Sequence, residues 1–226
     1  MKRTISVINI VEVAVYVIIA GLIIYGKILG MKSYEAFLTL TKEDGIAEYL
    51  TALFLFASAI VFLVKSIRTR RGKNYKMLAF NLLLFLLFFF ATGEEISWGQ
   101  RIFNLRSGDF FLEKNTQDEI NFHNLKFGGI AINKLVFSQL MFAAIIFYFV
   151  LLKFLVRLSS FFRKVVLMFD IPVPRYHHVM VLLISALLVI FIHLKRESEL
   201  YELALSGIFF LVFLHPANVS ERNEGS

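Results

Sequence analysis

Six long apolar runs, separated by short polar segments, make up most of the chain. They cover residues 6–29, 46–66, 77–97, 134–156, 178–194 and 199–215. A helix needs roughly 20 predominantly apolar residues to cross a bilayer, and each run is close to that length. The pattern therefore predicts an all-α integral membrane bundle of about six transmembrane helices.

The polar segments between the runs differ in length and in character. The connection 98–133 is long and contains many Phe, Leu and Ile residues, so we expect it to fold over one end of the bundle, with a short interfacial helix near 108–114. Basic and apolar residues alternate over 158–169, which favours a helix lying along the membrane surface. We predict one transmembrane domain, residues 1–217, followed by a disordered polar tail, residues 218–226.

Composition supports a membrane protein and excludes several classes. Hydrophobic residues make up 58% of the 226 positions, and the mean hydropathy is +0.71, which no ordinary soluble domain approaches. The chain has no cysteine, so disulfides, thiolate metal sites and cysteine nucleophiles are excluded. We expect membrane lipids as partners, and the sequence does not indicate an oligomeric state.

The net charge of +7 acts here as a topology signal rather than as a nucleic-acid-binding surface. Basic residues concentrate in segment 65–76 and again in 153–175, between apolar runs. Such loops stay in the cytoplasm, so six crossings place both termini there and the connection 98–133 on the external side. We therefore expect no nucleic-acid partner.

Acidic residues gather at the helix ends that this topology places on the external side. Glu48 follows Glu43 and Asp44 into the second run, and Glu199 and Glu202 open the sixth. The apolar neighbours of Glu48 and Glu202 predict that both point into the bundle. Crowded carboxylates repel one another, so we expect protons, a cation or an arginine to neutralise some of them.

The stretch 93–101, Gly-Glu-Glu-Ile-Ser-Trp-Gly-Gln-Arg, ends the third run and gives the strongest signal in the sequence. Glu94 and Glu95 lie at a helix C-terminus, where the helix dipole disfavours anions. Ionisable groups at a membrane boundary are costly to desolvate and are functional candidates by default. We predict Glu94 and Glu95 as catalytic residues, and Gln100 and Arg101 as binding residues.

A second polar cluster follows about twenty residues later and fits either a helix or an extended segment. Its alternating members, which would face one way in an extended strip, are Asn115, Gln117, Glu119, Asn121 and His123, with Asn124 adjacent. We predict His123 as a catalytic acid or ligand and the other members of this cluster as binding residues. Glu48, Glu199 and Glu202, from the helix ends described above, are predicted as binding residues as well. A divalent metal is compatible with this set, with Glu94, Glu95, Glu119 and His123 as candidate ligands for calcium, magnesium, manganese or zinc.

Other ionisable residues have simpler interpretations. Glu12, in the inner half of the first run, is expected to snorkel or to pair with a neighbouring base. His177 and His178 adjoin a cytoplasmic basic segment and are expected to be solvated. His215 is also on the cytoplasmic side, so we leave it out of the site.

The two central motifs, Gly93 to Phe103 and Asn115 to Leu125, resemble the signature of an uncharacterised family of bacterial multi-pass membrane proteins. The starts of the second run, Glu43-Asp44-Gly45-x-x-Glu48, and of the sixth, Glu199-Leu-Tyr-Glu202, are similar to the same family. The resemblance implies a bacterial inner-membrane protein. It implies no reaction, because the family has no established activity.

Three functions fit these patterns. The first is an enzyme with an outward-facing site, in which a glutamate acts as base on a lipid or lipid-linked substrate. The second is a transport protein that binds protons or cations, although the third and fourth runs lack the polar residues of a pathway. The third is a non-catalytic membrane subunit whose polar layer joins helices or receives a partner.

Overall fold

The computed structural model describes residues 7–72, 74–115, 118–122, 125–127, 130–131 and 141–218. This part of the chain is almost entirely helical, apart from the two-residue strands β1 (Lys126–Phe127) and β2 (Ile130–Ala131), which pair antiparallel. The helices of the first half are α1 (Val7–Lys32), α2 (Tyr34–Thr41), α3 (Ile46–Arg71), α4 (Tyr75–Glu95), the 3₁₀ turn η1 (Ser97–Gly99) and α5 (Asp109–Lys114). Those of the second half are α6 (Met141–Ile146), the π-helical segment η3 (Phe147–Leu151), α7 (Leu152–Leu158), α8 (Ser160–Phe169), α9 (Tyr176–Ile190) and α10 (Ser198–Leu214).

Each predicted apolar run corresponds to a helix, but not all of these helices are long enough to cross a membrane. Four segments are, by length and composition: Val7–Lys32, Tyr34–Arg71, Tyr75–Glu95 and Met141–Leu158. α9 has 15 residues and α10 has 17, so these two are shorter. The described residues therefore contain four candidate spans, and the count of six crossings stays a prediction.

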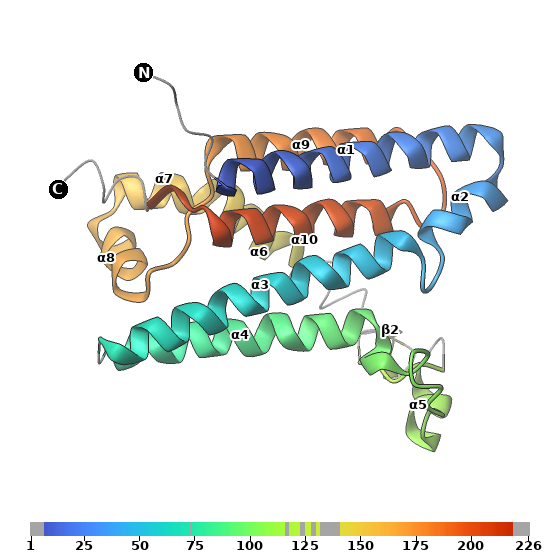
Figure 1. Ribbon diagram of the computed structural model, residues 1–226, viewed down its shortest axis with the longest axis horizontal. Coiled ribbons are helices and arrows are strands. Elements are labelled where there is room, and N and C mark those ends of the chain that lie inside the picture. Colours follow the sequence, from blue (N-terminus) through green and yellow to red (C-terminus); the bar gives the residue numbers. More distant parts are fainter. Residues whose placement is uncertain are drawn as a thin grey trace.

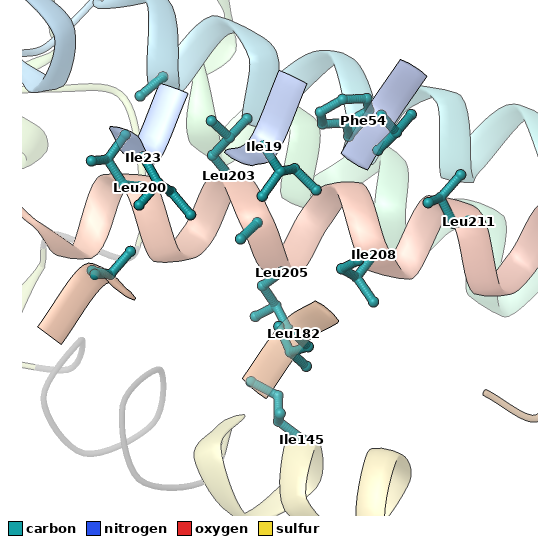
Figure 2. Close-up of a cluster of buried hydrophobic side chains, with 14 of the residues drawn as sticks. Ile19, Ile23, Phe54, Ile145, Leu182, Leu200, Leu203, Leu205, Ile208 and Leu211 are labelled. Carbon is teal, nitrogen blue, oxygen red and sulfur yellow. The ribbon is translucent and has the colours of Figure 1, made fainter. Parts of the chain in front are cut away.

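α10 is the central helix of the bundle. Its buried residues Leu200, Leu203 and Ile208 belong to one hydrophobic core with Ile19 and Ile23 of α1, Phe54 of α3, Leu182 of α9 and Ile145 of α6 (Figure 2). By contrast, less than half of the apolar stretch of each candidate span is buried inside the structure. This distribution is the one expected if lipid covers the outer helices.

The helices place distant parts of the chain at two ends of the bundle (Figure 1). α1 and α9 begin, and α10 finishes, at one end, which we call the Glu12 end. α4 finishes and α10 begins at the other, where η1, α5 and the β1–β2 hairpin also lie; we call it the Glu95 end. The predicted short helices are present as α5 and α8.

Asn218 is the first residue of the predicted polar tail and the last residue that the structure describes. Its side chain donates to the Ile171 carbonyl at 3.1 Å and accepts from the Val173 N–H at 3.4 Å. Residues 219–226 lie outside the described part of the chain. The predicted domain bounds therefore stay a prediction.

Candidate functional site

The last turn of α4 is followed by an unusual backbone turn that positions Trp98. Ser97, Trp98 and Gly99 all have positive φ, at 46°, 53° and 76°. This turn folds the indole of Trp98 back over Gly93, where an added Cβ would lie 2.8 Å from the ring. Gly93 is thus required because any larger residue would collide with Trp98.

Glu94 joins α4 to the connection that follows it. Its side chain is buried, one carboxylate oxygen accepts from the Trp98 indole N–H at 2.8 Å, and the other accepts from the Phe122 backbone N–H at 2.7 Å. Both oxygens therefore have hydrogen-bond donors from residues 98 and 122. These two hydrogen bonds are partly buried, and they tie residues 98 and 122 to the end of α4.

Glu119 forms the centre of a second buried network in the connection. One of its oxygens accepts from the Ser97 hydroxyl at 2.9 Å and from the Asn121 amide at 2.6 Å, and the other pairs with Arg101. The Asn115 amide donates to the carbonyl and to the side-chain oxygen of Asn121, both at 2.9 Å. These residues hold the connection against the end of α4.

Gln100 also holds the connection in place, through hydrogen bonds to three of its residues. Its side-chain oxygen accepts from the Ile120 N–H at 2.7 Å, and its amide donates to the Ser107 hydroxyl at 2.8 Å and to the Asp118 carbonyl at 3.3 Å. Asp118 has φ of 56°, so the backbone between residues 118 and 122 is not a regular extended strip. Asn115, Glu119 and Asn121 converge, as the extended alternative predicts, whereas Gln117 and His123 lie outside the described residues, so the five-residue strip stays a prediction.

Two arginines connect this network to the ends of other helices. Arg101 lies 3.0 Å from Asp44 and 3.9 Å from Glu43, at the start of α3, as well as against Glu119. Arg196, in the turn before α10, contacts Glu43 at 2.5 Å and Glu199 at 3.3 Å.

The charge state of Arg196 follows from these partners. Burial alone would lower the pKa of the guanidinium, but the hydrogen bonds and negative charge of Glu43 and Glu199 raise the pKa above its ordinary value. Arg196 therefore stays charged. It neutralises part of the negative charge that gathers at this end of the bundle.

Glu95 has surroundings unlike those of Glu94. It is half-buried and lies within electrostatic range of Glu48 on α3 and of Glu199 and Glu202 on α10. Glu48 is buried, and its carboxylate accepts from the Asp44 N–H at 2.7 Å, which caps the start of α3. We call Glu48, Glu95, Glu199 and Glu202 the carboxylate cluster.

The structure brings most, but not all, of the predicted site residues together. Glu48, Glu94, Glu95, Gln100, Arg101, Asn115, Glu119, Asn121, Glu199 and Glu202 all lie at the Glu95 end. Glu202 is exposed rather than turned into the bundle, because Leu200, Leu203 and Ala204 occupy the buried face of α10. Gln117, His123 and Asn124 lie outside the described residues, so their predicted roles stay predictions.

Sequence reasoning missed a second polar cluster, at the Glu12 end. His178 is fully buried rather than solvated, and its Nε2 lies 3.1 Å from Glu12 Oε1. His215 Nδ1 lies 2.9 Å from the same oxygen, and His177 Nε2 lies 3.6 Å from it. The expectation of solvation agrees with the exposure of His177 but is wrong for His178, because α9 begins against α1. The signal in the sequence is chain direction, which brings the starts of α1 and α9 and the end of α10 to the same end of the bundle.

The geometry defines a class of protein: a helical bundle whose described part has four helices long and apolar enough to span a membrane and a polar layer at each end. Comparisons with protein-family models, with curated proteins and with solved structures found no match for the chain. The family resemblance drawn from the motifs therefore stays a prediction.

Proposed function

We propose that this chain is a multi-pass membrane protein that carries out acid–base chemistry on a lipid or lipid-linked substrate at the Glu95 end, with Glu95 as the proton acceptor. One observation carries this proposal. Glu95 is half-buried among like-charged carboxylates, whereas the neighbouring Glu94 has both oxygens occupied by internal donors. A general base must have an oxygen available to the substrate, and Glu95 meets that condition better than Glu94.

An apolar surface at the Glu95 end supports a lipid as the substrate. The connection exposes Ile102, Phe103 and Leu105 directly after Arg101, and α5 exposes Phe110 and Leu112. Exposed apolar patches of this kind mark contacts with membranes or with apolar ligands. A lipid held on this surface would lie at the same end of the bundle as the carboxylate cluster.

The excess of carboxylates also restricts the reacting group. Arg101 and Arg196 are both paired with acidic side chains, so neither offers an unpaired charge to a phosphate. A neutral or cationic polar group fits this site better than an anionic one, because the remaining carboxylates repel anions. The cytoplasmic location of both termini and the bacterial inner membrane belong to this proposal as well.

Lipid analysis of whole membranes tests the catalytic role. Membranes containing the wild-type chain are compared by mass spectrometry with membranes containing Glu95→Gln. The matched control is Glu113→Gln, on the exposed surface of α5. We expect lipid species to change with the wild type and with Glu113→Gln, but not with Glu95→Gln. Identical lipid profiles for the wild type and Glu95→Gln would contradict the role of Glu95.

A second function, a non-catalytic membrane subunit, is favoured by a different observation. The hydrogen-bonding groups of Glu94, Glu119 and Asn121 are used to hold the connection in place, as in a purely structural layer. If the wild-type chain leaves membrane lipids unchanged while Glu94→Gln lowers its thermal stability, this second function is the better one.

A further inference from the structure

The polar cluster at the Glu12 end combines residues from three helices that are far apart in the sequence. Glu12 comes from the first turns of α1, His177 and His178 from the first turn of α9, and His215 directly follows α10. The ligand atoms of Glu12, His177 and His178 all lie within 4.8 Å of one another. In the described part of the chain, no other group of three such residues meets this spacing.

These distances suit a small metal ion. Tetrahedral zinc has ligands at about 2.0–2.2 Å, so neighbouring ligand atoms lie roughly 3.3 Å apart. The oxygen of Glu12 is 3.1 Å from the nitrogen of His178 and 3.6 Å from that of His177. His177 is the half-exposed member of the three, so its side chain is the one that would rotate toward the other two ligands.

The exposure of one of its three residues makes the cluster open to solvent. Glu12 and His178 are buried, whereas the His177 side chain is 47% exposed. Two fixed ligands and one solvent-facing ligand provide an entry path for an ion and leave a fourth position for water. The chain has no cysteine, so imidazole and carboxylate are its available ligands for a transition metal.

Neighbouring groups supply a surrounding shell. The Tyr16 hydroxyl is buried without a hydrogen-bond partner, one helical turn after Glu12, and its ring packs edge-on against His177. A metal-bound water is a partner of the kind that this hydroxyl lacks. His215 hydrogen-bonds Glu12 at 2.9 Å and would orient its carboxylate, as residues that hydrogen-bond to metal ligands commonly do.

His178 must change its protonated nitrogen for an ion to bind. The Arg175 N–H now donates to His178 Nδ1 at 3.3 Å, which places the ring proton on Nε2, facing Glu12. An ion on Nε2 moves that proton to Nδ1 and releases the hydrogen bond from Arg175. This bond is long and therefore weak, so its loss costs little against two imidazole ligands and a carboxylate.

We propose that Glu12, His177 and His178 form a binding site for a divalent transition metal ion of the zinc type, with His215 as a positioning residue for Glu12. This site lies at the opposite end of the bundle from the carboxylate cluster (Figure 1) and is independent of the proposed acid–base function.

Cobalt titration of the full chain tests this site. The protein is purified in detergent with a histidine-free tag, stripped with a chelator and titrated with Co²⁺, whose visible absorption reports tetrahedral coordination by nitrogen and oxygen. We expect one Co²⁺ per chain, displaced by Zn²⁺. The affinity should fall roughly tenfold or more in His177→Ala, because loss of a direct ligand costs at least as much as loss of a second-shell partner.

Two further variants complete the test. His193→Asn, in the turn after α9 and outside the cluster, is the matched control and should bind Co²⁺ like the wild type; asparagine suits its φ of 57°. Glu12→Gln retains the side-chain shape and should also lose the tetrahedral spectrum. Absence of stoichiometric binding in the folded wild type, or equal binding in His177→Ala and wild type, would overturn the proposal.

Discussion

Glu94 and Glu95 are adjacent in the chain, yet they occupy two different regions of the Glu95 end. The Glu94 region includes Trp98, Phe122 and the network around Glu119, and its hydrogen-bonding groups are paired with one another. The Glu95 region faces α3 and α10, where like charges are close together. Successive residues on a helix point about 100° apart, so Glu94 faces the connection while Glu95 faces the carboxylate cluster.

The comparison predicts that substitutions in the Glu94 region reduce stability, whereas substitution of Glu95 does not. The largest effect is expected for Glu119→Ala, which removes the acceptor of Ser97 and Asn121 and a partner of Arg101. Breaking this buried network should lower the free energy of unfolding by about 2–4 kcal/mol. This is the lower end of the range for a buried ion pair, because Arg101 is partly exposed and keeps Asp44 as a partner. Denaturant unfolding in detergent micelles measures this loss. A change below about 0.5 kcal/mol, the size of an ordinary surface effect, would contradict the network.

Gly93→Ala is expected to be the next most damaging change. The added methyl group would meet the Trp98 ring at 2.8 Å, so the indole must move away from its partners. Overpacking of this kind costs about 1–3 kcal/mol. Trp98 is the single tryptophan in the chain, so its fluorescence emission should shift directly. Gly108→Ala, where an added Cβ meets nothing within 4 Å, is the matched control.

Glu94→Gln should have a smaller effect. The amide can still accept one hydrogen bond, but its NH₂ group faces a donor from Trp98 or Phe122. We expect a loss of about 1–2 kcal/mol together with altered Trp98 emission. Unchanged emission would show that the indole does not contact Glu94.

The smallest effect on stability is expected for Glu95→Gln. Removing one charge from the carboxylate cluster relieves repulsion, so the free energy of unfolding should stay within about 0.5 kcal/mol of the wild type or increase. The same micelle unfolding experiment gives the value. A loss as large as that of Glu94→Gln would place Glu95 in the structural network instead.

The sequence predicted the gross arrangement well, for physical reasons. Apolar runs fix the helices, and alternating directions along the chain bring the start of α3, the end of α4 and the start of α10 to one end. The short helix α5 also followed from the apolar character of the connection. These features depend on local pattern and chain direction, both of which are visible in sequence.

Other features depend on geometry that a pattern does not contain. The different roles of Glu94 and Glu95 follow from the left-handed turn at Ser97 and Trp98, which decides where the connection runs. The exposure of Glu202 follows from the rotation of α10 about its own axis. The cluster around Glu12 was missed for another reason. Chain direction places Glu12 and the three histidines on one side of the membrane, but no local pattern joins residues so far apart in the sequence.

Cross-linking between engineered cysteines tests the central claim, that α4 and α10 bring their acidic ends together, most directly. The chain has no native cysteine, so Glu95→Cys with Glu202→Cys gives a clean pair in membranes. Glu95→Cys with Tyr176→Cys, at the Glu12 end, is the control. The account predicts an intramolecular link by a short bis-maleimide in the first pair and none in the control. Failure of the first pair to link, although both cysteines react with a monofunctional maleimide, would contradict it.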